Sequence, residues 1–379
     1  MKAGLRVVLT GGGTGGHVYP ALSVVAASVR AGESADFRWV GTAQGMERQI
    51  VERARIPFES VAASAIRGRS PATMARALLT MAQGTRQALT AIRRWRAEVV
   101  LATGGFVCVP VVLAAKLAGI PSVVYLPDLR PGWAVRFLSR VATAVAVSFD
   151  DVRQFIPARH VYVTGYPVRP DFLEWSAEHG RGALGIDDNA PVTLVLGGSR
   201  GAQSINRAVS ENLETLLERS WLVHAAGTDN VAELKRRRDT LPPALQSRYC
   251  LYPYLDSELV PALVSATIVV ARSGASVLGE LPAVGAPGIL VPYPHAGGHQ
   301  RLNASFLAER GAAIVVEDDA ARSGALGPII LELLADEARR REMSAAARRL
   351  ARPNASLDLF HLLGKVAFPV KQQAIGRWA

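Results

Sequence analysis

An extended apolar run, a glycine-rich turn and a helical pattern follow one another twice in this chain. The first copy reads LRVVLTGGGTGGH from Leu5, and the second reads PVTLVLGGSRGAQ from Pro191. Glycine tolerates positive φ and lets backbone N–H groups approach a ligand closely, so both turns suit an anionic group. Apolar strands that alternate with helices predict parallel sheets covered by helices. We therefore expect an α/β chain with two doubly wound domains.

The rest of the chain continues the same alternation. A helix is expected over Val18–Ala31, and a long helical region over Pro71–Trp95. The run EVVLATGGFV in the first half has a counterpart, TIVVARSGAS, in the second. We expect the halves to join near Gly165–Phe172. Because open α/β sheets bind ligands at the carboxyl ends of their strands, the two glycine loops should line the rims of one cleft.

Composition describes a globular protein with ample core. Of 379 residues, 49% are hydrophobic and 20% charged, which fits two folded domains and excludes a disordered chain. Cys108 and Cys250 lie in apolar runs, so we expect reduced thiols in buried strands rather than a disulfide framework. No signal peptide is expected. The apolar segment Val107–Leu126, which contains Lys116 and two prolines, reads as strand, helix and strand rather than a membrane span. These features favour a cytoplasmic protein.

The first glycine loop also matches a dinucleotide-binding pattern. Gly11, Gly13 and Gly16 fit G-x-G-x-x-G. A dehydrogenase with this pattern uses an acidic residue about 20 residues later to hold the ribose. The second expected strand instead ends in WVGTAQG, with no acidic residue at its tip. A nicotinamide or flavin enzyme is therefore disfavoured.

Motifs along nearly the whole chain resemble those of the MurG family. In chain order they are GGTGGHVYPALSV, GTAQGMERQIV, TGGFV, GYPVR, LGGSRGAQSIN, RSGA and HQRLNA. Members of that family are inverting N-acetylglucosaminyltransferases of peptidoglycan synthesis. The resemblance implies a GT-B fold of two Rossmann-like domains, with UDP-N-acetylglucosamine as donor and lipid-linked muramyl-pentapeptide pyrophosphate as acceptor. It also implies domains at 1–166 and 167–355, with a C-terminal helix at about 356–379 crossing back to the first.

The resemblance further implies which residues contact the UDP-sugar. The matching positions are Arg169 and Ser199 for the nucleotide, Leu255 for the uracil edge through its backbone, Ala275 in the RSGA turn, Glu280 for the ribose and Gln300 for the donor sugar. A carboxylate can accept two ribose hydroxyl protons, and an amide both donates and accepts. The simpler alternatives are a helix N-cap for Ser199, a solvated surface residue for Arg169 and a helix-surface salt bridge for Glu280.

Neither a metal ion nor another cofactor is expected. Metal-dependent transferases usually hold a divalent ion through an Asp-x-Asp motif, and the sequence contains none. The charge on the donor diphosphate must then be met by backbone N–H groups, a helix N-terminus and arginine.

In the MurG family the first glycine loop serves the junction of donor and acceptor. Thr14, Gly15 and Gly16 would lie against the diphosphate and sugar, with His17 beside them. The acceptor hydroxyl must lose its proton as it attacks the anomeric carbon, and an imidazole with a pKa near ~6.5 can take it at neutral pH. His17 is therefore the candidate base. The alternative is that His17 only orients groups or caps the helix.

One segment departs from the family pattern. Where the family usually shows His-Glu-Gln-Asn, this chain reads YLPD, Tyr125 to Asp128. Asp128 when ionised only accepts hydrogen bonds, whereas asparagine also donates, and Leu126 removes a carboxylate from the expected cleft rim. Three functions stay open: transfer to the muramyl lipid, transfer to another lipid or small-molecule acceptor, and sugar-nucleotide binding without catalysis.

Positive charge concentrates in one stretch, Ala65–Arg96, of a chain whose net charge is +11. It contains no acidic residue and carries Arg67, Arg69, Arg76, Arg86, Arg93, Arg94 and Arg96, with Met74, Leu78, Leu79 and Met81 among them. A basic helix with an apolar face can lie on an anionic membrane, which a lipid-linked acceptor requires. Nucleic-acid binding lacks a module or stacking platform here and is not expected. We therefore expect a peripheral protein at the cytoplasmic face of the cell membrane, with arginine-rich composition alone as the alternative.

Overall fold

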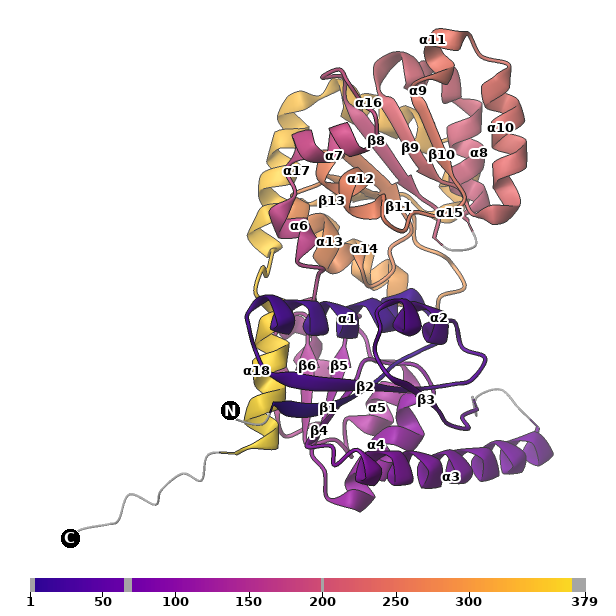
Figure 1. Ribbon diagram of the computed structural model, residues 1–379. Coiled ribbons are helices and arrows are strands. Elements are labelled where there is room, and N and C mark those ends of the chain that lie inside the picture. The colour runs from indigo at the N-terminus through magenta and orange to yellow at the C-terminus, as the bar shows by residue number, and fades with distance from the viewer. Residues whose placement is uncertain (1–3, 65–69, 199–200, 370–379) are drawn as a thin grey trace. The chain divides into compact units, whose positions relative to one another are not determined.

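The computed structural model describes residues 4–64, 70–198 and 201–369, and these form two compact units (Figure 1). The first unit contains the residues up to Arg169 together with those from Asn354 onward, and the second contains residues 170–353. The boundaries predicted from sequence, after residues 166 and 355, lie a few residues away. Arg169 therefore belongs to the first unit, although the predicted boundary assigned it to the second.

Within the described part of the first unit, seven parallel strands form one sheet in the order β3-β2-β1-β4-β5-β6-β7. The strands are β1 Leu5–Thr10, β2 Ala35–Gly41, β3 Phe58–Ser60, β4 Val99–Ala102, β5 Ser122–Leu126, β6 Ala144–Val147 and β7 Val161–Val163. The helices are α1 Gly15–Arg30, α2 Met46–Arg53, α3 Pro71–Arg94, α4 Cys108–Ala118, α5 Trp133–Leu138, the 3₁₀ helix η1 Asp150–Phe155, and α18 Ala355–Ala367. The order reverses between β1 and β4, so the loops that follow these two strands are neighbours at the carboxyl edge.

Both faces of this sheet are buried, because successive side chains of a strand point to opposite faces. Val7 and Leu9 of β1 pack in one apolar layer with residues of α1 and α18. Val8 packs in the other layer, with residues of α3 and α4. Figure 1 shows α1 on one side of the strands and α3 and α4 on the other. The uninterrupted apolar run of β1 therefore reflects burial on both faces.

The last described helix, α18, completes the core of the first unit. Leu359, Phe360 and Leu363 are buried in the layer that includes β1 and α1, and the rings of Phe360 and Phe37 lie 6.2 Å apart. Ser356 Oγ donates to the carbonyl of Val168 at 2.9 Å, which ties the start of α18 to the end of the first-unit chain. The predicted range of about 356–379 is thus a helix up to Ala367, and residues 370–379 lie outside the described residues.

In the described part of the second unit, six parallel strands form a sheet in the order β10-β9-β8-β11-β12-β13. The strands are β8 Val192–Leu196, β9 Trp221–Ala225, β10 Tyr249–Tyr252, β11 Ile268–Ala271, β12 Gly288–Leu290 and β13 Ala313–Val315. The helices are α6 Asp171–Glu174, α7 Ala177–Ala183, α8 Gln203–Glu211, α9 Leu213–Arg219, η2 Thr228–Asn230, α10 Val231–Asp239, α11 Pro243–Gln246, α12 Leu259–Ser265, α13 Val277–Val284, α14 His299–Glu309, α15 Asp318–Arg322, α16 Leu326–Ala335 and α17 Glu337–Leu350. The order reverses between β8 and β11, as it does between β1 and β4.

The two sheets confirm the predicted α/β fold class of two doubly wound parallel sheets, but two local predictions are wrong. The first helix begins at Gly15, three residues before the predicted Val18, because the glycine turn closes earlier than its composition suggested. Cys108 opens helix α4 instead of lying in a strand, since β4 ends at Ala102 and Gly104 and Gly105 turn the chain at positive φ. Burial raises the pKa of the Cys108 thiol to about 12, so this thiol stays protonated.

A buried hydrogen-bond chain joins α8 to β9 and β10 in the second unit. The imidazole of His224, fully enclosed in β9, is 2.9 Å from the Tyr249 hydroxyl through Nδ1 and 3.0 Å from Asn206 Oδ1 through Nε2. Because Asn206 Oδ1 can only accept, Nε2 carries the proton of the neutral ring and Nδ1 accepts from Tyr249. Asn206 Nδ2 also donates to the Ala226 carbonyl at 2.8 Å. Burial lowers the pKa of His224 to about 3.

This depressed pKa predicts a pH-dependent stability of the second unit. In the unfolded chain the imidazole titrates near ~6.5, so between pH 6.5 and 3 the unfolded state binds the extra proton. The free energy of unfolding should therefore fall as pH drops through this window, by at most on the order of 1 kcal/mol per pH unit. Asp318, whose pKa its hydrogen bonds lower to about 2, contributes only below about pH 4.

The measurement is urea unfolding at several pH values from 7.5 to 4.5. His224→Gln should be less stable than the native protein at pH 7.5 but should show a shallower loss of stability on acidification. His160→Gln, at an exposed position of the first unit, serves as the matched control and should keep the native slope. Equal slopes for the native protein and His224→Gln would contradict the assignment.

Candidate functional site

The first glycine loop connects β1 to α1 and holds the His17 ring in one orientation. His17 Nδ1 lies 3.0 Å from the Gly12 carbonyl and 3.3 Å from Thr14 Oγ1. A carbonyl oxygen can only accept, so Nδ1 carries the proton of the neutral ring and Nε2 keeps its lone pair. The half-buried His17 is therefore held in the tautomer that can accept a proton through Nε2.

The loop after β4 packs against the His17 ring. Gly104 has a φ of +126°, and a Cβ at this position would come within 2.5 Å of His17 Cδ2. Gly12 N donates to the Gly104 carbonyl at 3.2 Å, and Thr103 Oγ1 donates to the His17 carbonyl. The TGGF motif thus packs closely against the first glycine loop. Any side chain at Gly104 would displace the imidazole of His17.

The start of α1 presents the other predicted residues of this loop. Thr14 is the N-cap of α1 in an extended conformation, and Gly15 and Gly16 are the first two helical residues. The N–H groups at the start of a helix have no partner within the helix and carry partial positive charge. Thr14, Gly15, Gly16 and His17 are therefore together at the carboxyl edge of the first sheet, where an anion can be bound.

The YLPD segment lies at the end of β5, and most of it belongs to the core. Tyr125 is fully buried, with its hydroxyl 2.8 Å from Ser148 Oγ and 3.3 Å from the Gly165 carbonyl. Burial raises the pKa of this phenol, and the negative charge of Asp128 raises it further. Leu126 is only 2% exposed, so its side chain also packs in the core of the first unit. Asp128 is half-buried in the turn that follows.

Arg169, the last residue of the first segment of the first unit, lies beside α1. Its guanidinium carbon is 5.5 Å from the centre of the Tyr19 ring, and Tyr19 is on α1 two residues after His17. An arginine over an aromatic face is held by the charge distribution of the ring. Arg169 is therefore a half-buried residue beside α1 rather than a freely solvated one.

The second glycine loop connects β8 to α8. Gly198 and Gly201 adopt positive φ, and a Cβ at Gly201 would come within 2.6 Å of Asn230 Nδ2. Asn230 Nδ2 donates to the Ala226 carbonyl at 3.0 Å, so the turn after β9 packs against this loop. Ser199, predicted to contact the nucleotide, lies outside the described residues.

A buried carboxylate organises the turns after β11 and β12. Asp318 accepts from Ser204 Oγ of α8 at 2.5 Å, from Arg272 Nη1 at 2.6 Å and from Arg322 Nε at 2.8 Å. Arg272 also donates to the Val291 carbonyl at 3.1 Å. The side chain of Asp318 is 3% exposed, and its hydrogen bonds with these partners lower its pKa to about 2. One carboxylate thus fixes the start of α8, the RSGA turn and the end of β12.

Three of the residues predicted to contact the UDP-sugar lie on the segments that follow β11 and β12. Ala275 is in the RSGA turn, and Glu280 is partly buried on the first turn of α13. Gln300 is the second residue of α14 and accepts at Oε1 from Tyr293 N at 2.9 Å, so its Nε2 group is the end that can donate to a hydroxyl. Asn303 Nδ2 donates to the Ser273 carbonyl at 3.1 Å and joins α14 to the RSGA turn.

Leu255 occupies a separate loop, which follows β10. Its side chain is 3% exposed and therefore anchors the loop, so any recognition of a base must use the backbone. All four loops, after β8, β10, β11 and β12, are at the same edge, because every neighbouring strand pair is parallel.

Sequence reasoning missed two residues with buried charge. Asp318 was not noticed, because nothing in its local sequence links it to the RSGA turn 46 residues earlier. Glu47 lies in the quoted motif GTAQGMERQIV without an assigned role, yet it is 1% exposed and accepts a hydrogen bond from Gly13 N. A charged residue two positions after a glycine, at the start of a helix, was the available signal.

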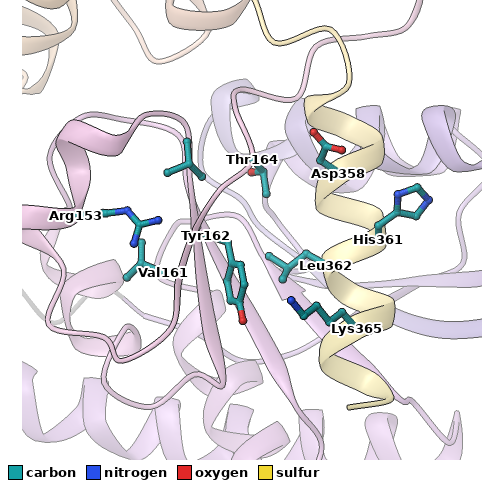
Figure 2. A pocket seen from close by; sticks show the side chains of 9 residues that line it. Arg153, Val161, Tyr162, Thr164, Asp358, His361, Leu362 and Lys365 are labelled. Atoms are coloured by element: carbon teal, nitrogen blue, oxygen red, sulfur yellow. The ribbon is translucent and has the colours of Figure 1, made fainter. Parts of the chain in front are cut away.

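A hollow of about 450 Å³ lies apart from the glycine loops, between β7 and α18 (Figure 2). Tyr162 of β7 and Lys365 of α18 face each other across it, with the Lys365 ammonium 5.3 Å from the centre of the Tyr162 ring. None of the predicted site residues lines this hollow. It therefore does not add to the candidate site.

Among the residues that the structure describes, no group of three or more His, Cys, Asp or Glu side chains is arranged to hold a metal ion. In the same part of the chain, no helix combines the length and the apolar character that a membrane crossing needs.

Comparison with protein families and curated proteins gives matches over nearly the whole chain. Residues 7–147 match the glycosyltransferase family 28 N-terminal domain, and residues 192–358 match the C-terminal domain of that family. A relative from Roseiflexus sp. strain RS-1 is 42% identical, covering 95% of this chain and 94% of its own, and one from Desulforudis audaxviator is 40% identical, covering 96% and 99%. Both are named UDP-N-acetylglucosamine–N-acetylmuramyl-(pentapeptide) pyrophosphoryl-undecaprenol N-acetylglucosamine transferase.

Solved structures have the same fold. The crystal structure of MurG from Acinetobacter baumannii matches with a TM-score of 0.73 and 26% identity, covering 95% of this chain and 99% of that one. A putative UDP-N-acetylglucosamine 2-epimerase from Listeria monocytogenes matches with a TM-score of 0.68 at 18% identity, which shows a shared fold only. The two domain matches, the relatives and the MurG structure agree with the order of the motifs and with the two sheets. This chain belongs to the MurG family within glycosyltransferase family 28.

Proposed function

We propose that this protein transfers N-acetylglucosamine from UDP-N-acetylglucosamine to the C4 hydroxyl of lipid-linked N-acetylmuramyl-pentapeptide, with inversion at the anomeric carbon. The observation that carries the proposal is identity of 40% or more, over nearly the full length, with two relatives named for this transfer. The chemistry needs a base for the acceptor, donors for the leaving diphosphate and a surface for the lipid. The described residues offer a candidate for each.

The proposed base is His17. Its Nδ1 proton is directed to the Gly12 carbonyl, and Nε2 is left to accept the proton of the sugar hydroxyl as that oxygen attacks. General-base catalysis of this kind contributes typically 10²–10⁴-fold in rate. The N–H groups of Gly15 and Gly16 lie at the start of the same helix, where negative charge is stabilised.

The second unit is the proposed donor site. Glu280 would hold the ribose hydroxyls, Gln300 Nε2 the sugar, and the backbone at Leu255 the uracil edge. Ala275 in the RSGA turn and the N-terminal end of α8, with Ser199, would lie near the diphosphate. The anchoring of these turns by Asp318 supports the proposal, since a donor site with fixed dipoles needs little rearrangement when the sugar bond breaks.

A related transferase with another lipid or small-molecule acceptor is the second candidate, and the YLPD segment favours it. Tyr125 and Leu126 are core residues. Their difference from the family pattern therefore alters packing in the core more than it alters the exposed edge of the sheet. Asp128 is the member of the segment that remains partly exposed, and its carboxylate is limited to accepting hydrogen bonds when ionised. Acceptor selection is the property that this substitution would alter.

We infer that the protein is peripheral on the cytoplasmic face of the membrane, with α3 as one contact. Met74, Leu78 and Leu79 are 41%, 54% and 72% exposed, whereas Met81, also predicted for this face, is buried at 6%. Arg76, Arg86 and Arg93 are exposed on the same helix. Arg94 instead pairs with Glu59 of β3, and Arg67 and Arg69 lie outside the described residues. Apolar side chains beside arginines suit an anionic lipid surface.

A second exposed stripe lies on α5. Trp133, Arg136 and Phe137 are exposed at spacings of three and four residues, which places them on one side of the helix. Arg140, two residues after the helix ends, is also exposed. Tryptophan is favoured at membrane–water interfaces, where its ring is partly apolar and partly polar. Helix α4 packs against both α3 and α5, so the two stripes belong to the same helical layer.

The first test of the proposed function is turnover without metal. In the presence of EDTA, the protein should release UDP from UDP-N-acetylglucosamine at a rate that depends on added lipid-linked muramyl-pentapeptide. His17→Gln should lower kcat by roughly 10²–10⁴-fold, because the base is lost, while His160→Gln should leave kcat unchanged. UDP release only with a different acceptor would replace this proposal with the second candidate. Donor binding without any turnover would indicate a binding protein.

The second test separates donor binding from catalysis. Calorimetric titration of UDP in chelator should show binding, and Glu280→Ala should weaken it by roughly 1–3 kcal/mol, the usual loss when a partly buried hydrogen-bonding partner is removed. Glu309→Ala, an exposed carboxylate near the end of α14, is the matched control and should bind UDP normally. Loss of UDP binding in chelator would refute the metal-free donor site.

The third test concerns the membrane contact. Changing Arg76, Arg86 and Arg93 to Gln should weaken the free energy of binding to anionic vesicles by about 3 kcal/mol, at ~1 kcal/mol per charge. Co-sedimentation with the vesicles measures this binding. Vesicle binding should also fall as salt rises, because surface charges are screened over about 8 Å at physiological ionic strength. A triple Gln variant of Lys235, Arg236 and Arg237 removes equal charge from exposed positions of the second unit. Equal losses in both triple variants would show that net charge, not α3, governs binding.

A further inference from the structure

Glu47 is a buried acidic residue whose hydrogen bonds connect it to the first glycine loop. It is the second residue of α2, immediately after the turn that follows β2, and it is 1% exposed. Its Oε1 accepts from Thr42 N at 3.0 Å and from Thr42 Oγ1 at 2.6 Å. Its Oε2 accepts from Gly13 N at 3.3 Å. One carboxylate thus joins the β2–α2 turn to the β1–α1 loop.

The glycines of both turns create the space for this carboxylate. A Cβ at Gly12 would come within 2.7 Å of the Glu47 carboxyl carbon, and a Cβ at Gly41 within 3.2 Å of its Cγ. Glu47 also lies in the first turn of α2, where the helix dipole stabilises negative charge. The site is therefore shaped for a side chain whose two oxygens accept from three donors.

The contact continues from Glu47 to His17 through the backbone. Gly13 is held by Glu47, and the preceding Gly12 is held on its other side by the bond from its N–H to the Gly104 carbonyl at 3.2 Å. Gly12 in turn accepts from His17 Nδ1 at 3.0 Å. The carbonyl that fixes the tautomer of His17 is therefore positioned by a carboxylate that lies 34 residues after Gly13 in the chain.

We propose that Glu47 is a positioning residue for transfer: its carboxylate holds Gly12 and Gly13 so that the Gly12 carbonyl keeps His17 Nε2 directed toward the acceptor hydroxyl. This inference rests on the proposed function of His17 as base. Charge on Glu47 matters because all three of its partners are donors. A glutamine whose Oε1 faces Thr42 would place its own N–H₂ against Gly13 N–H, and two donors repel one another.

The central comparison uses two variants that remove bonds to the same carboxylate. Glu47→Gln breaks the bond to Gly13, whereas Thr42→Val removes only the hydroxyl donor and leaves Gly13 in place. We expect Glu47→Gln to lower kcat at least tenfold, with the KM for UDP-N-acetylglucosamine nearly unchanged. Thr42→Val should change kcat by less than threefold even if its Tm falls as much. Glu52→Gln, an exposed residue of α2, controls for the loss of charge.

A double-mutant cycle with His17 distinguishes positioning from general destabilisation. If Glu47 acts through the imidazole, Glu47→Gln should have little further effect on kcat in a His17→Gln background. Losses that multiply fully in the double variant would overturn the proposal. So would equal losses of kcat in Glu47→Gln and Thr42→Val at matched stability.

A measurement that does not depend on turnover tests the contact between Glu47 and Gly13, even if the protein transfers a different group. Hydrogen exchange of the Gly13 amide, followed on the full-length protein, should be at least tenfold faster in Glu47→Gln than in Thr42→Val. Unchanged Gly13 exchange in Glu47→Gln would refute the role of Glu47. Absence of transferase activity in the native protein would instead refute the proposed function.

Discussion

Parallel strand pairing determines where chemistry can occur in this molecule. Neighbouring strands that run in the same direction place all their carboxyl ends at one edge, and each of these ends must be followed by a loop. In each unit the strand order reverses once, between β1 and β4 or between β8 and β11. The two loops beside each reversal are led apart by helices on opposite faces, so their backbones are the ones most open to a ligand.

Glycine makes these loops adaptable, and buried polar side chains then hold them. In the first unit, the Glu47 carboxylate and, from the backbone, the Gly104 carbonyl hold the loop that leads into α1 and His17. In the second unit, Asp318 holds Ser204 and Arg272, while Asn206 connects α8 to the turn after β9. A loop without side chains has high conformational entropy when free, so such anchors reduce the number of shapes that it adopts. Both units therefore combine bare backbone with buried hydrogen-bonding groups.

The fold class could be predicted from sequence, since apolar runs and glycine turns report directly on strands, helices and their order. The position of His17 at the start of the helix that follows the first glycine loop could also be predicted for this reason. Its environment could not, because Gly104 and Glu47 come from separate turns and meet it only in the folded sheet. Cys108 was misplaced for a related reason: an apolar run does not reveal that two glycines within it turn the chain into a helix.

The sequence alone also could not show which side chains are exposed, because exposure depends on contacts with distant elements. The sequence of α3 shows apolar residues mixed with arginines, but it does not show which of them pack against α4. Met81 is buried and Leu79 is exposed, although both are apolar and only two positions apart. Arg94 similarly has a partner, Glu59, from a strand about 35 residues earlier. Pairing with other elements decides which side chains remain available at the surface.

The return of α18 to the first sheet has a consequence for biosynthesis. A ribosome produces the seven strands of the first unit long before it produces Leu359, Phe360 and Leu363, which cover one face of that sheet. Until those residues emerge, Val7, Leu9 and Trp39 lack part of their apolar cover, and exposed apolar surface in an incomplete domain promotes aggregation. The second unit, made from the continuous segment 170–353, has no such dependence. During synthesis the unit encoded later can thus complete its core first, and the nascent N-terminal half is the part that most needs chaperone protection.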